Sequence, residues 1–240
     1  MSPAGGSSWP ARIPQRVFAM DALRLRAGIS HCSFPGCAIV LDLDRDRYWQ
    51  VGTDVAAALD WLADRRAGPL APGQLDRLER LGFVEPTKPE SLLEQAPSLP
   101  SPTHSAIEGD ARKQAFDPIA ATEVAYRVVM AQRLVERRSL RWNIADIEHR
   151  RIGKEVAPSG CVAALAQAFS RYRRLVPLAN KCLPDTLAFL RFAARRGHYP
   201  RLVFGVEAWP FAAHCWAQAD DLVLNDVLDH ARSFSHILVI

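Results

Sequence analysis

The chain has 240 residues, 49% of them hydrophobic, and a formal net charge of +4. This length is enough to bury a full hydrophobic core in one or two domains. No stretch approaches the roughly 18 consecutive apolar residues of a membrane span, and residues 1–9 lack the charged-then-apolar order of a secretory signal. The sequence therefore predicts a cytoplasmic protein without membrane contact. Its mild positive charge is spread along helical segments, which indicates a solvated face and no nucleic-acid site.

The first third of the chain predicts strands followed by helices. Residues 38–42 and 47–51 are short runs on either side of a polar turn, which is a hairpin pattern. Helical spacing follows from Asp54 to Leu62 and again from Leu75 to Leu81. Residues 1–86 are predicted to form a compact α+β domain.

A change of composition follows this domain. Six prolines lie between residues 86 and 118, with serines among them. This composition predicts a linker over residues 87–117.

The remaining residues, 118–240, predict a second domain of helices followed by a mainly antiparallel sheet. Helical spacing or caps mark the first part, and β-rich runs mark the second. The predicted helices cover 118–138, 144–151, 161–172 and 182–196, and the predicted strands cover 201–206, 211–218, 222–225 and 234–240. The overall fold class is therefore α+β.

Cysteine usage excludes some kinds of site. The five cysteines, at 32, 37, 161, 182 and 215, are odd in number and contain no C-x-x-C pair. They suit neither a disulfide framework nor a zinc site, and no metal or cofactor is predicted. Most of them are expected to be small buried hydrophobes.

Cys182 has a different setting, because a helix is predicted to begin there. Asn180 is an acceptable cap, and Pro184 fits only a first helical turn. The positive helix end and Lys181 both favour a thiolate, so Cys182 is a candidate nucleophile. A buried structural cysteine is the alternative.

A candidate base and a candidate acid lie on the predicted strands that follow. In a hairpin whose turn is centred on Asp220, the numbers of two opposite residues add up to 440. His214 would therefore face Asp226. Such a carboxylate would hold the imidazole in the useful tautomer. The alternatives are a core histidine and a solvated acid at a strand end. A nucleophile on a helix, then His and Asp on strands, is the order of transglutaminase-like and papain-like cysteine proteases.

Residues 182–197 (CLPDTLAFLRFAARRG), 202–206 (LVFGV), 210–216 (PFAAHCW) and 224–226 (LND) together resemble the B protein of lasso-peptide biosynthesis. The resemblance implies a leader peptidase with the triad Cys182, His214 and Asp226.

The first domain extends this resemblance. Residues 38–51 and the helix after them are similar to a small, winged-helix-like leader-recognition domain related to the peptide chaperone of pyrroloquinoline quinone biosynthesis. The resemblance implies that the leader adds as a strand beside residues 47–51 and against a helix at 74–81. The implied leader-binding residues are Arg47, Tyr48, Trp49, Val51 and Leu78, although a plain hydrophobic core explains the apolar ones equally well.

The resulting hypothesis is a cysteine endopeptidase that removes the leader from a lasso-peptide precursor. The implied partners are the precursor peptide and an asparagine-synthetase-like lasso cyclase. A non-catalytic peptide chaperone is the first alternative. DNA-binding regulation is a remote second, because it rests only on the winged-helix-like order and the basic charge.

Overall fold

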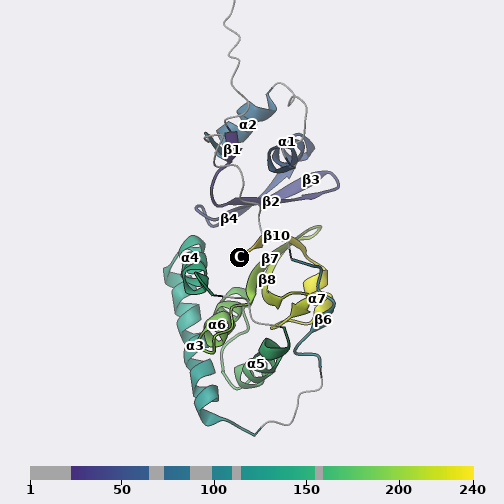
Figure 1. Cartoon of the computed structure of the whole chain (residues 1–240). Helices are drawn as coiled ribbons and strands as arrows, with labels where there is room; N and C mark the ends of the chain where they lie inside the picture. Colours follow the sequence, from purple (N-terminus) through teal and green to yellow (C-terminus); the bar gives the residue numbers. More distant parts are fainter. Residues whose placement is uncertain (1–22, 65–72, 87–98, 110–114, 155–158) are drawn as a thin grey trace, which may run out of the picture.

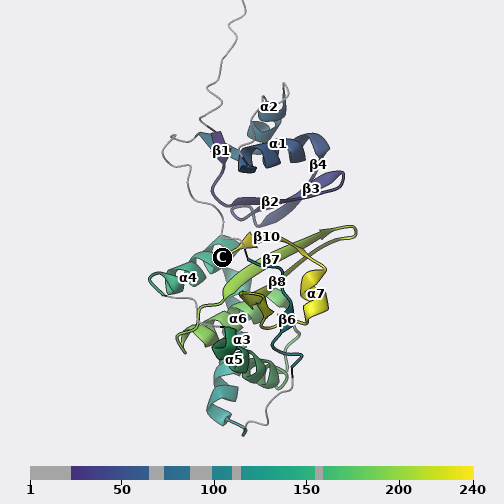
Figure 2. The same ribbon diagram turned by 45° about the vertical axis from the view of Figure 1, so that its right-hand side comes forward.

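The computed structural model describes residues 23–64, 73–86, 99–109, 115–154 and 159–240. Most of the predicted linker (87–98 and 110–114) and residues 1–9 lie outside this part of the chain. Figure 1 shows the N-terminal strands and helices stacked on the C-terminal unit, and the turned view in Figure 2 shows the same stacking. No helix in the described ranges is long and apolar enough to cross a membrane.

The N-terminal unit contains a three-stranded antiparallel sheet with the strand order β2-β3-β4. Its elements are β1 (Leu23–Leu25), β2 (Ile29–Phe34), β3 (Cys37–Asp42), β4 (Arg47–Gly52), α1 (Thr53–Asp64), α2 (Gln74–Leu81) and β5 (Val84–Pro86). The predicted hairpin is confirmed, with Asp42 opposite Arg47. Strands β1 and β5 form a separate antiparallel pair.

Strand β3 is buried on both faces, which explains why it is uninterruptedly apolar over residues 37–41. Val40 packs with Leu59 and Phe83 on the side of the helices. Ile39 and Leu41 face the other way and join the core of the C-terminal unit. The N-terminal sheet therefore lies between its own helices and the C-terminal unit.

The C-terminal unit places helices against a five-stranded sheet with the order β10-β7-β8-β9-β6. The helices are α3 (Pro118–Arg137), α4 (Leu140–Arg151), α5 (Ser159–Arg173), α6 (Cys182–Ala194) and α7 (Leu228–Arg232), and the strands are β6 (His104–Ser105), β7 (Arg201–Ala208), β8 (Phe211–Ala219), β9 (Leu222–Val223) and β10 (Ser235–Val239). Helix α6 packs on α3 on one side and on β8 on the other (Figure 1). An α+β fold is confirmed.

Residues 99–109, inside the predicted linker, are part of this unit. Strand β6 pairs in parallel with β9, and the side chain of Gln218 donates to the carbonyl of Pro100 at 2.9 Å. This stretch is therefore no free linker. The Pro- and Ser-rich composition did not indicate the two-residue strand β6, which adds to the edge of the sheet.

The register predicted for the β8–β9 hairpin is wrong by one residue. Gln218 lies opposite Val223 and Ala219 opposite Leu222, so the paired numbers sum to 441 and the turn is the two-residue Asp220–Asp221. Asp220 adopts a positive φ of 51°, which an Asp tolerates in a tight turn. Strand β9 also ends at Val223, two residues before the predicted end.

The two units meet along an apolar and partly charged boundary. The ring of Phe34 contacts that of Trp209 at 6.4 Å between centroids, and the ring of Tyr48 contacts that of Phe211 at 5.6 Å. Arg141 on α4 also binds the Asp44 carboxylate at 2.6 Å. Strand β4 is thereby held over the start of β8.

Candidate active site

Cys182 is the first residue of α6, as predicted, and its side chain is exposed. The cap differs from the prediction: Lys181, and not Asn180, is the N-cap residue, and it makes no side-chain capping bond. The carboxylate of Asp185 accepts the Lys181 backbone N–H at 3.1 Å instead. This arrangement leaves the thiol at the positive end of the helix, where a thiolate is stabilised.

A buried arginine fixes the segment that leads into Cys182. The guanidinium of Arg173 donates to Asp185 at 2.7 Å and to the carbonyls of Val176, Leu178 and Ala179 at 3.1–3.3 Å. The Arg173 side chain is 9% exposed, so these bonds are shielded from water. Arg173 was missed in the sequence because its partners are mostly backbone carbonyls.

His214 lies on β8 directly opposite Gly205 of β7. A Cβ at Gly205 would lie 2.6 Å from the Cβ of Phe234 and 2.8 Å from the Trp216 ring, so only glycine fits there. The imidazole packs between Trp216 and Phe234, with centroid distances of 6.0 and 5.2 Å. The glycine thus allows the apolar packing that fixes the ring.

Asp226 meets His214 although the two residues are not cross-strand partners. The Nε2 atom of His214 lies 2.5 Å from Oδ2 of Asp226, and the two side chains are 14% and 17% exposed. Since β9 ends at Val223, Asp226 lies in the loop before α7 and turns back toward β8. The predicted cross-strand pairing of His214 with Asp226 is therefore wrong, although their side chains meet.

Two polar side chains hold this loop. Asn225 accepts the Ala217 backbone N–H at 2.7 Å and donates to the Thr186 hydroxyl at 2.8 Å, so it joins β8, the loop and α6. The hydroxyl of Ser105 donates to the Asp226 carbonyl at 2.6 Å from β6. Neither bracing role was predicted, although Asn225 belongs to the L-N-D motif.

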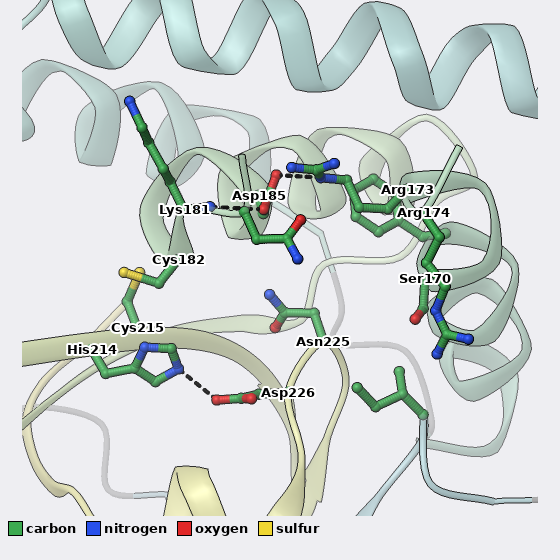
Figure 3. Close-up of a pocket in the computed structure, with 13 residues that line it drawn as sticks. Ser170, Arg173, Arg174, Lys181, Cys182, Asp185, His214, Cys215, Asn225 and Asp226 are labelled. Atoms are coloured by element: carbon green, nitrogen blue, oxygen red, sulfur yellow. Dashed lines mark hydrogen bonds and ion pairs between the residues drawn. The ribbon is translucent and has the colours of Figure 1, made fainter. Parts of the chain in front are cut away.

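The three side chains come together around one pocket, as Figure 3 shows. The dashed line from His214 to Asp226 leaves the second ring nitrogen, Nδ1, on the side of Cys182 (Figure 3). The pocket has a volume of about 500 Å³ and is also lined by cationic side chains that include Arg174 and Lys181. It can admit an extended peptide segment beside the thiol.

The electrostatics favour a thiolate on Cys182. A hydrogen bond from the Cys215 thiol, together with hydrogen bonding and attraction to His214, lowers the pKa of Cys182 to about 4 against the opposing effect of burial. The fully buried Cys215 is shifted the other way: the neighbouring Cys182 and burial raise its pKa well above the usual value. Cys182 is the charged member of this pair because it lies at the helix end and in the pocket.

The pKa values of the candidate base and the candidate acid are shifted in opposite directions, and each shift favours the charged form. Burial alone would lower the pKa of His214, but hydrogen bonds to Asp226 and Cys182 and attraction to their charges raise it to about 9. Burial opposes ionisation of Asp226, yet hydrogen bonding and attraction to His214 hold its pKa below the usual value. At neutral pH the site is a thiolate, an imidazolium and a carboxylate.

Of the residues predicted to bind a leader, not all lie on one surface. Side chains alternate along a strand, so Tyr48 points toward the C-terminal core, whereas Trp49 and Val51 pack on the helix side. Arg47 is exposed and stacks over the Trp49 ring at 5.5 Å. Leu78 is fully buried in the same helix-side core and offers no free surface.

Comparison with known families identifies the C-terminal part of the chain. Residues 122–239 match the model of the transglutaminase-like superfamily. This segment is a transglutaminase-like domain. Superfamily members generally use catalysis of the cysteine-protease type. Neither the curated proteins nor the solved structures gave a significant match to the chain.

Cys215 lies beside the candidate nucleophile of the transglutaminase-like domain. Figure 3 shows the two sulfur atoms side by side, and hydrogen bonding from the Cys215 thiol is the largest effect on Cys182. Replacing Cys215 by Ala removes this donor, so the pKa of Cys182 should rise. Cys215→Ser retains a donor and should keep it low. The pH dependence of iodoacetamide labelling at Cys182, followed by mass spectrometry, measures this; equal profiles for Ala and Ser would contradict it.

Proposed function

We propose that the protein is a cysteine endopeptidase that removes the leader from a lasso-peptide precursor. The observation that carries the peptidase part is the contact of His214 with Asp226 at 2.5 Å beside a thiol at a helix N-terminus. The transglutaminase-like domain supports a cysteine-peptidase fold. The leader-specific part follows from the motifs around residues 182–226 and from the N-terminal sheet.

In this proposal the Cys182 thiolate attacks the carbonyl carbon of the scissile peptide bond. The Cys182 backbone N–H, in the first helical turn, donates to the developing oxyanion. His214 gives its Nδ1 proton to the leaving amine as the C–N bond breaks and leaves a thioester. It then takes a proton from the water that hydrolyses the thioester, while Asp226 holds the ring.

Leader capture is assigned to the free edge of β4. Within the described ranges β4 pairs only with β3, so its other edge offers unpaired backbone groups to an added strand. The indole Nε1 of Trp49 is buried and has no hydrogen-bond acceptor among these residues. A bound leader would supply strand hydrogen bonds and an acceptor for this group.

The position of Tyr48 links this edge to the catalytic centre. Its ring contacts Phe211 at the start of β8, three residues before His214. Burial is the main cause that raises the pKa of Tyr48, and the negative charge of Cys182 raises it further, so its hydroxyl lies within electrostatic reach of the nucleophile. A leader on β4 therefore brings the chain that follows it close to the thiol, at a high effective concentration.

We assign residues 1–86 to leader binding and residues 118–240 to cleavage, in one cytoplasmic enzyme. The free amine that cleavage exposes on the core peptide is a nucleophile for amide formation. An asparagine-synthetase-like cyclase would then act next and would be a partner of this chain. The proposal requires no metal or cofactor.

Hydrogen exchange on the full-length Cys182→Ala variant tests leader binding. Adding the intact precursor peptide should slow exchange of the β4 amides at Arg47–Gly52, because the leader would pair with them. The amides of β2 (Ile29–Phe34), which packs beside β10, serve as the internal control. Equal exchange with and without precursor would contradict this binding mode.

Mass spectrometry of precursor incubated with wild type tests cleavage and should show leader and core products. Binding of the precursor without these products would indicate the chaperone alternative.

A further inference from the structure

A second histidine shares the carboxylate of the candidate triad. The Nδ1 atom of His230, on α7, lies 2.8 Å from Oδ2 of Asp226, the same oxygen that Nε2 of His214 approaches at 2.5 Å. The two imidazole centroids are 4.4 Å apart. His230 was not among the residues that the sequence suggested, because it lies on a five-residue helix that the strand pattern does not predict.

The surroundings of His230 fix its ring. It packs edge-on against Phe234 at 5.3 Å between centroids, and Phe234 also contacts His214. The side chain is 48% exposed, so one side of the ring faces solvent while Nδ1 faces the carboxylate. Asp226 therefore has a fixed hydrogen-bonding neighbour on each side of Oδ2.

The other oxygen of Asp226 is also held. Oδ1 accepts the Val227 backbone N–H at 2.8 Å. Both carboxylate oxygens thus have partners, and rotation of the carboxylate would break the bonds to His230 and Val227 as well as that to His214. A carboxylate that is fixed in this way keeps the imidazole in one orientation.

The same three side chains could be considered as metal ligands, since their donor atoms all lie within 4.8 Å of one another. Two ligands on one tetrahedral zinc, each at 2.0–2.1 Å, are separated by roughly 3.3 Å. The distances from Oδ2 of Asp226 to the nitrogens of His214 and His230 are 2.5 and 2.8 Å. They are shorter than that separation and fit hydrogen bonds better.

From this geometry we infer that His230 is a positioning residue, which fixes Asp226 so that His214 stays aligned with the Cys182 thiolate. His230 is not among the residues that line the pocket around the thiol, and its hydrogen bond to the site goes to Asp226. The inference rests on the proposed peptidase site and adds a fourth member to it.

Three variants at one position test this inference. In His230→Asn the side-chain amide can replace the Nδ1–H donor, whereas in His230→Gln the amide lies near the position of Nε2 and does not match Nδ1. His230→Ala has no donor. For precursor cleavage, kcat should fall about tenfold in the Ala and Gln variants with KM within about twofold, and Asn should restore kcat to within about threefold of wild type.

Iodoacetamide labelling of Cys182 near pH 4, the midpoint of its titration, provides a readout that needs no peptide substrate. Labelling should slow about threefold or more in His230→Ala and His230→Gln, because the thiolate–imidazolium pair is less well held, and should recover in His230→Asn. Equal labelling rates for the Asn, Gln and Ala variants would overturn the inference. If circular dichroism showed that the Ala variant alone does not fold, equal labelling rates for the Asn and Gln variants would overturn it. If wild type did not cleave the precursor, labelling would still decide the role of His230, so the two failures are distinguishable.

Discussion

Replacing Cys182 by Ala is expected to abolish cleavage of the precursor peptide, with a loss of about 10⁴-fold or more in kcat. Without the sulfur atom no thioester forms, and the pocket retains only binding and an oxyanion donor. The rate should be measured by mass spectrometry of leader and core products under single-turnover conditions. The variant should still bind the precursor, since the thiol lies outside the N-terminal sheet.

Cys32→Ala is the matched control for this experiment. Cys32 is a half-buried thiol on β2, far in sequence from the site, and it packs at the edge of the main core. Its replacement should leave the cleavage rate within about twofold of wild type. Cleavage by Cys182→Ala at the wild-type rate would remove Cys182 from the mechanism and assign the activity to a different group or a contaminant.

The sequence predicted the helices and strands around the site well because their patterns are local. Helix α6 was predicted to begin at Cys182, and it does, since Pro184 fits only a first turn and the apolar spacing continues to Ala194. The strand that carries His214 was predicted to within one residue of β8. These features depend on neighbouring residues and need no knowledge of the tertiary fold.

The contact between His214 and Asp226 was predicted for the wrong reason. The sequence pattern predicts a strand as far as Asn225, which would make the pair opposite residues on a regular hairpin. In the structure β9 is two residues long, and side-chain bonds from Asn225 and Ser105 direct the loop toward β8. The bond between Ser105 and Asp226 joins residues more than 100 positions apart, so no local sequence pattern indicates it.

Tertiary packing also decided the positions that the leader-recognition resemblance left open. The pattern of β4 could not say which of its faces the C-terminal unit covers, and the structure places Tyr48 there, apart from Trp49 and Val51. Leu78 matches an amphipathic helix equally well as a core residue or a binding residue, and it is a core residue. The exposed edge of β4, and not this set of side chains, is the better candidate for leader capture.

A second large effect on the cleavage rate is expected from a change of pH and from replacement of Asp226. The proposed mechanism requires Cys182 to be deprotonated and His214 to be protonated. With pKa values of about 4 and about 9, the pH profile of kcat/KM should rise near pH 4, stay level through neutral pH and fall near pH 9. An unperturbed thiol and imidazole would instead leave little of the charged pair at any pH, because the imidazole would lose its proton before the thiol does.

Asp226→Asn should narrow the pH range of high kcat/KM at both its acidic and its basic end. The carboxylate is the main group that raises the pKa of His214, so its loss lowers that pKa and moves the falling limb to lower pH. An imidazole that is protonated less readily stabilises the thiolate less. The pKa of Cys182 therefore rises, and the rising limb moves to higher pH. At pH 7 the cleavage rate should drop about 10²- to 10⁴-fold.

The direction of these shifts separates an electrostatic role of Asp226 from a structural one. Cys182 labelling gives the rising limb without any substrate, and the nitrogen chemical shifts of His214 in a labelled sample give the falling limb. A loss of activity with both midpoints unchanged would mean that Asp226 acts only by supporting the loop before α7 and that Asn does not replace this support. Movement of both midpoints toward each other is the result that requires a charged Asp226 beside His214.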